Sequence, residues 1–186
     1  MRFTPTELAE VLIVDPDVYR DPRGFFLETF SAPKYRDGGI HLPFVQDNHS
    51  RSVAGTLRGL HLQLGEPMGK LVRVVVGAIF DVAVDVRRGS PTFGQWVGVP
   101  LSAENFRQCY IPPGFAHGFC VETPVAEVEY KCTALYDRSK EIGVAWNSPE
   151  LGIEWPVTSP LLSERDARLP ALGDALATLP RWTGPR

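Results

Sequence analysis

The sequence predicts an all-β fold, an antiparallel sandwich or barrel with few helices. Short runs rich in β-branched and aromatic residues recur at near-regular spacing along its 186 residues. Between these runs, 17 glycines and 17 prolines are spread along the chain, a distribution typical of tight turns. No linker, repeat or low-complexity segment divides the sequence, so we predict one domain over residues 1–186, with residues 167–186 as a peripheral tail.

Composition excludes several classes of protein. The chain is 44% hydrophobic and 22% charged, and its formal net charge of −3 provides no basic excess for nucleic acid or an anionic membrane. No apolar run approaches the ~18 residues that span a bilayer, and the N-terminus lacks the apolar region of a signal peptide. Cys109, Cys120 and Cys132 lack CxxC spacing and are expected to be buried thiols. We predict a cytoplasmic protein with no nucleic-acid or membrane partner.

The N-terminal part of the chain contains three candidate strands and one helix. The strands are predicted at residues 9–15, 25–30 and 44–50, with a turn at residues 21–24 where Asp-Pro-Arg-Gly stands. A short helix should begin after Ser31, because a serine N-cap followed closely by proline is typical of a helix start.

The richest β-like region is central. Residues 70–76 and 79–86 are full of β-branched side chains, and the two-residue segment Gly77-Ala78 predicts a hairpin between them. Alternation in the second strand places valines on one face and Asp81 and Asp85 on the other. If that polar face lines a cavity, the two aspartates become supporting hydrogen-bond partners, and Arg58, His61 and Lys70 become a site.

The C-terminal part continues the pattern of short strands and then changes character. Four strands are predicted at residues 95–99, 108–111, 118–121 and 126–133. Beyond Trp155 the chain is rich in proline and leucine, with short helices predicted from Ser163 and between Ala171 and Leu179.

Two of the four histidines lie in informative surroundings. His61 follows Arg58-Gly59-Leu60, where strand alternation keeps Arg58 off the face of His61 unless a β-bulge intervenes. His117 ends a Pro- and Gly-rich turn at residues 111–118. A lone histidine is more often structural than functional. Two histidines that both lie next to turn-forming residues and flank the same sheet favour a functional site.

These histidines carry a resemblance to the cupin superfamily of double-sheet jelly rolls. Gly55 opens the first cupin motif, His61 is its first histidine, and residues 112–117 match the second motif. Gln63 replaces the second metal-binding histidine, and Lys70 follows where the motif has a glutamate. Imidazole, amide and ammonium form a poor shell for a divalent metal, so the metal site is expected to be lost.

The departures match one family within that superfamily. An ordered series of segments from about Val11 to Asp166 resembles dTDP-4-dehydrorhamnose 3,5-epimerase. These segments are residues 58–63, 69–74, 80–87, 90–94, 113–119, 130–133, 151–156 and 162–166.

The resemblance implies a reaction without metal or cofactor. The family inverts C3 and C5 of a dTDP-4-dehydro-6-deoxyhexose, whose C4 ketone acidifies the neighbouring C–H protons. By resemblance, His61 is the base, which suits imidazole chemistry near neutral pH, and Asp166 orients it. Lys70 matches the cation beside the enolate oxygen, where charge develops. Tyr130 matches the acid that delivers a proton to the opposite face.

The resemblance also implies a nucleotide site and an assembly. Tyr136 matches a tyrosine that stacks on thymine. Arginines suit pyrophosphate because the guanidinium group pairs with its oxygens bidentately. The other residues expected to bind substrate are Arg23, Glu28, Gln46, Asp47, Asn48, Arg58, His117, Glu141 and Arg165. Family members are homodimers with exchanged N-terminal strands, so residues 25–30 would be the exchanged segment.

Three alternative functions remain open from the sequence. A single-centre epimerase of an antibiotic deoxysugar pathway would share the fold and the base, and Leu62 stands where many relatives carry an aromatic residue. A metal-dependent cupin oxygenase or isomerase would require a ligand shell that Gln63 and Lys70 disfavour. A non-catalytic sugar-binding cupin would have no need of a base paired with an orienting carboxylate.

Overall fold

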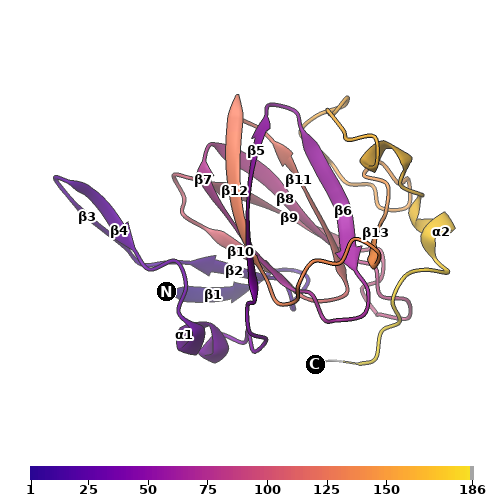
Figure 1. Cartoon of the computed structure of the whole chain (residues 1–186), viewed down its shortest axis with the longest axis horizontal. Helices are drawn as coiled ribbons and strands as arrows, with labels where there is room; N and C mark the ends of the chain where they lie inside the picture. Colours follow the sequence, from indigo (N-terminus) through magenta and orange to yellow (C-terminus); the bar gives the residue numbers. More distant parts are fainter. Residues whose placement is uncertain (185–186) are drawn as a thin grey trace.

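The computed structural model describes residues 1–184 and consists mainly of antiparallel β-sheet (Figure 1). A six-stranded sheet has the order β1-β2-β10-β7-β12-β5, and a five-stranded sheet has the order β13-β6-β11-β8-β9. The predicted all-β double-sheet jelly roll with a few short helices is confirmed. Within the part of the chain that the structure describes, every helix is too short or too polar to cross a membrane.

Residues 1–184 form thirteen strands and three short helical segments. The strands are β1 (Arg2–Pro5), β2 (Leu12–Asp15), β3 (Val18–Asp21), β4 (Gly24–Leu27), β5 (Gln46–Val53), β6 (Leu57–Gln63), β7 (Lys70–Val76), β8 (Ala78–Asp85), β9 (Trp96–Ser102), β10 (Gln108–Ile111), β11 (Phe115–Val121), β12 (Val125–Cys132) and β13 (Glu141–Gly143). The helical segments are α1 (Ala32–Asp37), the 3₁₀ turn η1 (Asp166–Arg168) and α2 (Leu172–Ala175).

Two apolar layers hold the body together. The first lies between the two sheets, where Val72 and Val74 of β7 pack in one cluster with Ile79 and Ala83 of β8. The second lies on the outer face of the five-stranded sheet. There the C-terminal segment covers the sheet. Its side chains Leu172, Ala175 and Leu179 belong to one apolar cluster with Val82, Val84 and Val86. Burial of apolar side chains on both faces therefore fixes β8 in the centre of the molecule.

The predicted hairpin between residues 70–76 and 79–86 is wrong. β7 pairs with β10 and β12 in one sheet, whereas β8 pairs with β11 and β9 in the other. The chain crosses between the sheets at Gly77, which has φ +76° and whose added Cβ would lie 2.1 Å from the carbonyl oxygen of Val125. The two-residue spacing suits a hairpin, but both strands have an apolar face, and burying these faces against each other places the strands in opposite layers.

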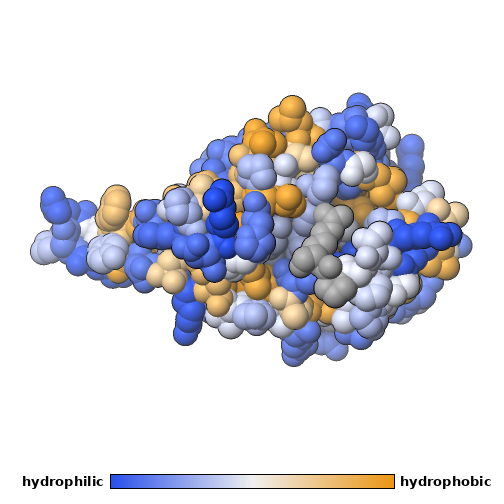
Figure 2. Space-filling view, turned by 90° about the horizontal axis from the view of Figure 1, so that it is seen from below, coloured by the Kyte–Doolittle hydropathy of each residue, from blue (hydrophilic) through white to orange (hydrophobic). Residues whose placement is uncertain are grey.

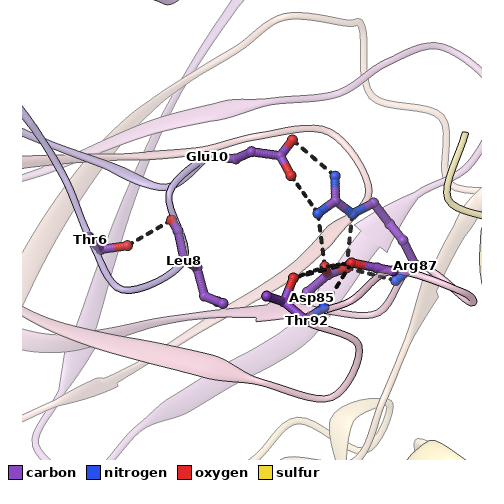
Figure 3. A network of polar contacts seen from close by, with 7 residues as sticks. Thr6, Leu8, Glu10, Asp85, Arg87 and Thr92 are labelled. Carbon is purple, nitrogen blue, oxygen red and sulfur yellow. Dashed lines mark hydrogen bonds and ion pairs between the residues drawn. The ribbon is translucent and has the colours of Figure 1, made fainter. Parts of the chain in front are cut away.

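Asp85 belongs to a structural network rather than to a cavity (Figure 3). Its carboxylate accepts hydrogen bonds from Arg87 at 2.9 Å and from Thr92 at 2.7 Å, and Arg87 also donates to both oxygens of Glu10. Burial alone would raise the pKa of Asp85, but the hydrogen bonds from Arg87, Ser90 and Thr92 outweigh it and leave the pKa lowered. The network ties the segment before β2 to the β8–β9 turn.

The β3–β4 hairpin forms an arm that projects from the body (Figure 1, indigo). Figure 2 shows it as a narrow extension that carries both hydrophilic and hydrophobic surface. Its aromatic residues Tyr19, Phe25 and Phe26 are exposed, Phe26 to 70%. The predicted strand at residues 25–30 is present but ends at Leu27, and α1 begins after Ser31 as predicted.

Candidate active site

Two adjoining hollows open beside β6 and β13. A cavity of about 330 Å³ is lined from five strands and two loops, and a neighbouring hollow of about 660 Å³ lies over the end of β6 and η1. Glu141 of β13 lines both. The smaller cavity is lined by Gln46, Asn48, Leu62, Gln63, Met68, Lys70, Tyr130, Cys132, Tyr136 and Glu141. Arg58, His61, Arg165 and Asp166 are among the residues that line the larger hollow.

A β-bulge in β6 brings Arg58 and His61 to one face. Arg58 lies opposite Phe119 of β11, and His61 lies opposite His117, so three steps along β6 match two steps along β11. Phe119 and His117 share a face because they are two residues apart, and their partners on β6 therefore share it as well. The sequence predicted that Arg58 and His61 could share a face only if a β-bulge intervened, and β6 contains that bulge.

His61 is paired with Asp166 of η1. The two side chains meet at 2.6 Å between Nε2 and Oδ1, and Asp166 is 5% exposed. Burial pushes the pKa of Asp166 upward, but the hydrogen bond and charge of His61 outweigh it and leave the pKa lowered. Since an ionised carboxylate can only accept, Nε2–H of His61 donates, and in the neutral imidazole Nδ1 then carries the lone pair. The geometry therefore presents Nδ1 as a base.

Lys70 and Tyr130 face the smaller cavity from neighbouring strands. Lys70 lies opposite Cys132 in the β7–β12 pairing, and Tyr130 is two residues from Cys132, so the three side chains share a face. Burial lowers the pKa of Lys70, while the charges of Cys132, Glu141 and Asp81 oppose the shift. Within residues 1–184, only burial and the charges of Cys132, Glu141 and Asp81 act on the Lys70 ammonium group, and no hydrogen bond engages it. It is free to bind an oxygen of a ligand.

Tyr130 keeps its phenolic proton at ordinary pH. Burial raises the pKa of its hydroxyl, the charges of Cys132, Glu141 and Tyr136 act in the same direction, and only the charge of Arg58 opposes the shift. A protonated phenol beside an ammonium group provides an acid and a cation in one cavity.

A second histidine–carboxylate pair lies behind His61. His117 is buried on β11, and its Nε2 lies 2.7 Å from Oδ1 of Asp81 on β8. Burial lowers the pKa of His117, and the adjacent carboxylate of Asp81 opposes that shift. Of the two aspartates proposed to line the cavity face, neither lines a hollow: Asp81 supports His117 behind His61, and Asp85 belongs to the network with Arg87.

The mouth of the site is a hydrogen-bonded cluster. Tyr136 donates its hydroxyl proton to Oε2 of Glu141 at 2.9 Å, and Arg165 forms an ion pair with the same carboxylate. Gln46 accepts the backbone N–H of Tyr136 at 2.8 Å and donates to Asn48 at 2.9 Å. These contacts hold the Tyr136 ring beside the cavity.

Four of the predicted site residues line neither hollow: His117, which is buried behind His61, and three others, Arg23, Glu28 and Asp47. Arg23 sits at the turn of the arm, where its side chain is 90% exposed and bonded to Asp21. Glu28 forms an ion pair with Lys34 near the base of the arm. Asp47 points to the opposite face of β5, where it pairs with Lys131. Within one chain, none of the three reaches His61 or Lys70.

The structure adds two residues that the sequence analysis did not assign to the site. Gln63 lines the cavity, donates to the carbonyl of Leu135 and accepts the N–H of Asp137, so it anchors the loop that carries Tyr136. Cys132 lines the cavity beside Lys70. Both stand two positions from a predicted site residue on the same strand. Because alternate residues of a strand share a face, this spacing could have placed them at the site. In residues 1–184, no three His, Cys, Asp or Glu side chains cluster as a metal site.

Comparison with known proteins identifies the family. The sequence model of the dTDP-4-dehydrorhamnose 3,5-epimerase family matches residues 5–174. The chain belongs to this family. It is 55% identical over 169 residues to the dTDP-4-dehydrorhamnose 3,5-epimerase of Shigella flexneri, which covers 89% of this chain and 93% of the relative.

Solved structures of epimerases agree with this assignment. A dTDP-6-deoxy-D-glucose-3,5-epimerase from Legionella pneumophila, in complex with dTDP-4-keto-L-rhamnose, superposes with a TM-score of 0.95 at 49% identity, covering 98% of this chain and 99% of that one. A 3'-monoepimerase from Streptomyces bikiniensis, in complex with dTDP-quinovose, superposes with a TM-score of 0.90 at 36% identity, covering 95% and 92%. The chain is an isomerase of the dTDP-4-dehydrorhamnose 3,5-epimerase family, and the predicted resemblance is confirmed.

Proposed function

We propose that this enzyme inverts C3 and C5 of dTDP-4-dehydro-6-deoxy-glucose and forms dTDP-4-dehydro-rhamnose. The observation that carries the proposal is the convergence of the His61–Asp166 pair, Lys70 and Tyr130 on adjoining hollows. The ligand of the Legionella relative supports the substrate class. Incubating the enzyme with this substrate and determining the C3 and C5 configurations of the product by NMR tests the proposal. A product unchanged at both carbons would contradict it.

The runner-up is a single-centre epimerase. The 3'-monoepimerase from Streptomyces bikiniensis has the same fold, and the superposition with this chain covers 92% of its length. Inversion at C3 alone or at C5 alone in the product would establish that alternative. The higher identity to double epimerases, 55% over 169 residues for the Shigella relative, favours inversion at both carbons.

The proposed chemistry assigns one step to each group. Nδ1 of His61 removes the proton from C3 or C5, and Asp166 stabilises the imidazolium that forms. The C–H electrons move into the enolate, whose oxygen lies beside the Lys70 ammonium group. Tyr130 then donates its hydroxyl proton to the carbon from the opposite face. Each inversion therefore leaves a protonated His61 and an ionised Tyr130.

The nucleotide would lie in the larger hollow. Arg58 and Arg165 both line it, and guanidinium groups pair bidentately with pyrophosphate oxygens. The Tyr136 ring is 50% exposed beside the smaller cavity, where a thymine could stack on it. Gln46, Asn48 and Glu141 would supply polar groups from the lining of the smaller cavity, and His117 would support the site from behind His61.

We further propose a homodimer in which the arm of each chain completes the site of its partner. The arm exposes aromatic residues that would be buried at an interface, and Arg23 and Glu28 lie outside the site of their own chain. Residues 1–186 would act as one cupin-like domain, with residues 167–186 as its tail, in the cytoplasm.

Mixed dimers test the exchange of arms. His61→Ala removes the base from one chain, and Arg23→Ala removes the arm cation from the other. If Arg23 serves the partner's site, a mixed dimer holds one intact site, and random mixing should restore about a quarter of the parent activity at low substrate. If Arg23 serves its own chain, mixing restores nothing. The measurement is the rate of each homodimer and of the refolded mixture.

Tyr130→Phe separates proton removal from proton return. The phenylalanine ring fills the same space but has no proton to donate, so inversion should fall by about 10²-fold. Deuterium uptake from D₂O with retained configuration should persist, since His61 can return a solvent-derived proton to the face it came from. Tyr35→Phe in α1, which removes a hydroxyl bonded to Thr29 and Gln108 outside both hollows, is the matched control. Inversion at the parent rate in Tyr130→Phe would assign the acid elsewhere.

A further inference from the structure

Glu141 lies beside the ring nitrogen of His61 that Asp166 leaves free. Its Oε1 is 3.9 Å from Nδ1, and its side chain is 15% exposed. The pairing of β13 with β6 produces this approach: Glu141 lies opposite Gln63, and Gly143 lies opposite His61. Because Gly143 has no side chain, nothing from β13 separates the imidazole from the carboxylate.

The same carboxylate reaches toward solvent on its other side. Oε2 accepts the Tyr136 hydroxyl proton at 2.9 Å and pairs with the Arg165 guanidinium group. Tyr136 is half exposed, and so is the Arg165 side chain at the mouth of the larger hollow. Glu141 therefore connects the base to the surface.

A double epimerase needs such a connection because the acid and the base are different groups. After one inversion His61 holds an extra proton and Tyr130 lacks one, so a second inversion requires both to be reset. Asp166 offers no exit, since it is buried and its lowered pKa keeps the carboxylate ionised. The open direction from His61 is the Nδ1 side, toward Glu141.

We infer that Glu141 is the proton relay that resets His61 between successive inversions, an inference that rests on the proposed function. In this step the Nδ1–H bond of the imidazolium breaks as an O–H bond forms on Glu141. The proton then passes to water or buffer at the mouth, while the Tyr130 phenolate takes a proton from water. No net proton is gained or lost over the cycle. A carboxylate is a weaker base than imidazole, so it holds the proton only in passing.

The relay determines how many centres are inverted. If resetting is slow, the singly inverted sugar can leave before the second C–H bond is broken. Glu141 is then a positioning residue that acts through His61 and controls the ratio of single to double inversion.

Glu141→Gln tests the relay, because the amide keeps the shape of the side chain and can still accept from Tyr136. In dilute buffer with saturating substrate, kcat for double inversion should fall by about 10-fold or more, and singly inverted sugar should accumulate. Added imidazole buffer should restore the rate, since a small base can carry the proton instead. The parent should show no dependence on buffer concentration, and Glu129→Gln on the outer face is the matched control.

Three results would overturn the inference. One is a Glu141→Gln variant with the parent rate and product ratio in dilute buffer. Another is a slow variant that buffer does not rescue, which would indicate a role in binding or packing. If Glu141→Gln does not fold, Glu141→Ala with added acetate is the second test, and failure of acetate to raise its rate is the third contrary result. Absence of deuterium uptake in the parent would instead contradict the proposed function itself.

Discussion

His61→Ala should lower deuterium uptake at both C3 and C5 by at least about 10³-fold. In this account one group removes both protons, because Nδ1 of His61 is the base and Asp166 holds its other nitrogen at 2.6 Å. Loss of the base should therefore stop exchange at the two carbons together. The rate of uptake, followed by NMR in D₂O under saturating substrate, is the measurement.

The control for this variant is His41→Ala. His41 is exposed in a loop and lies outside the two hollows, so its removal should leave the uptake rate unchanged. Affinity for dTDP should also survive in His61→Ala, since the charged groups that would bind the nucleotide remain. Uptake at one carbon at the parent rate would show that a second base serves that position.

Lys70→Met should lower kcat by about 10²–10³-fold with a small effect on KM. Methionine preserves the unbranched stem but removes the charge that faces the enolate oxygen. Because the negative charge develops only as the proton leaves, the ammonium group stabilises the transition state more than the bound ketone. Steady-state kinetics separate the two parameters. A change confined to KM would show that Lys70 binds substrate without assisting the chemistry.

The stability of the same variant offers an internal check. Burying a charge without a partner costs free energy, and the pKa of Lys70 is lowered chiefly by burial. Lys70→Met should therefore unfold at the same temperature as the parent or a higher one, so a loss of activity would not reflect unfolding.

The lowered pKa of Lys70 also predicts a limit to activity at high pH. The ammonium group assists while it is protonated, and this assistance is lost as pH rises through its folded pKa, which lies below the ~10.4 of a free lysine. Lys70→Arg stays charged, so its alkaline limit should move to higher pH.

Much of the fold follows from local patterns. Residues 108–111 form a strand with the predicted limits, and β12 differs from its prediction by one residue at each end. In contrast, β13 is only three residues long and exists because it pairs with the edge of β6, which no local pattern shows. The hairpin error has the same origin, since the choice of sheet depends on burial in the assembled molecule.

The site depended on more than residue spacing. Asp166 is separated from His61 by 105 residues, so the resemblance, and not periodicity, placed the two together. The position of Arg58 depended on a β-bulge, whose presence the sequence alone could not predict. In the segment predicted to be exchanged, Phe25 and Phe26 lie outside the core, whereas Phe30 packs against the cluster that contains Tyr35.

The most direct test of the account is deuterium uptake by the parent enzyme from D₂O into dTDP-4-dehydro-6-deoxy-glucose, resolved at C3 and C5 by NMR. Uptake with inversion is expected at both carbons, and both should be lost in His61→Ala. Folded enzyme that takes up no deuterium at either carbon would contradict this expectation, because the fold would then be present without enolate chemistry at this site.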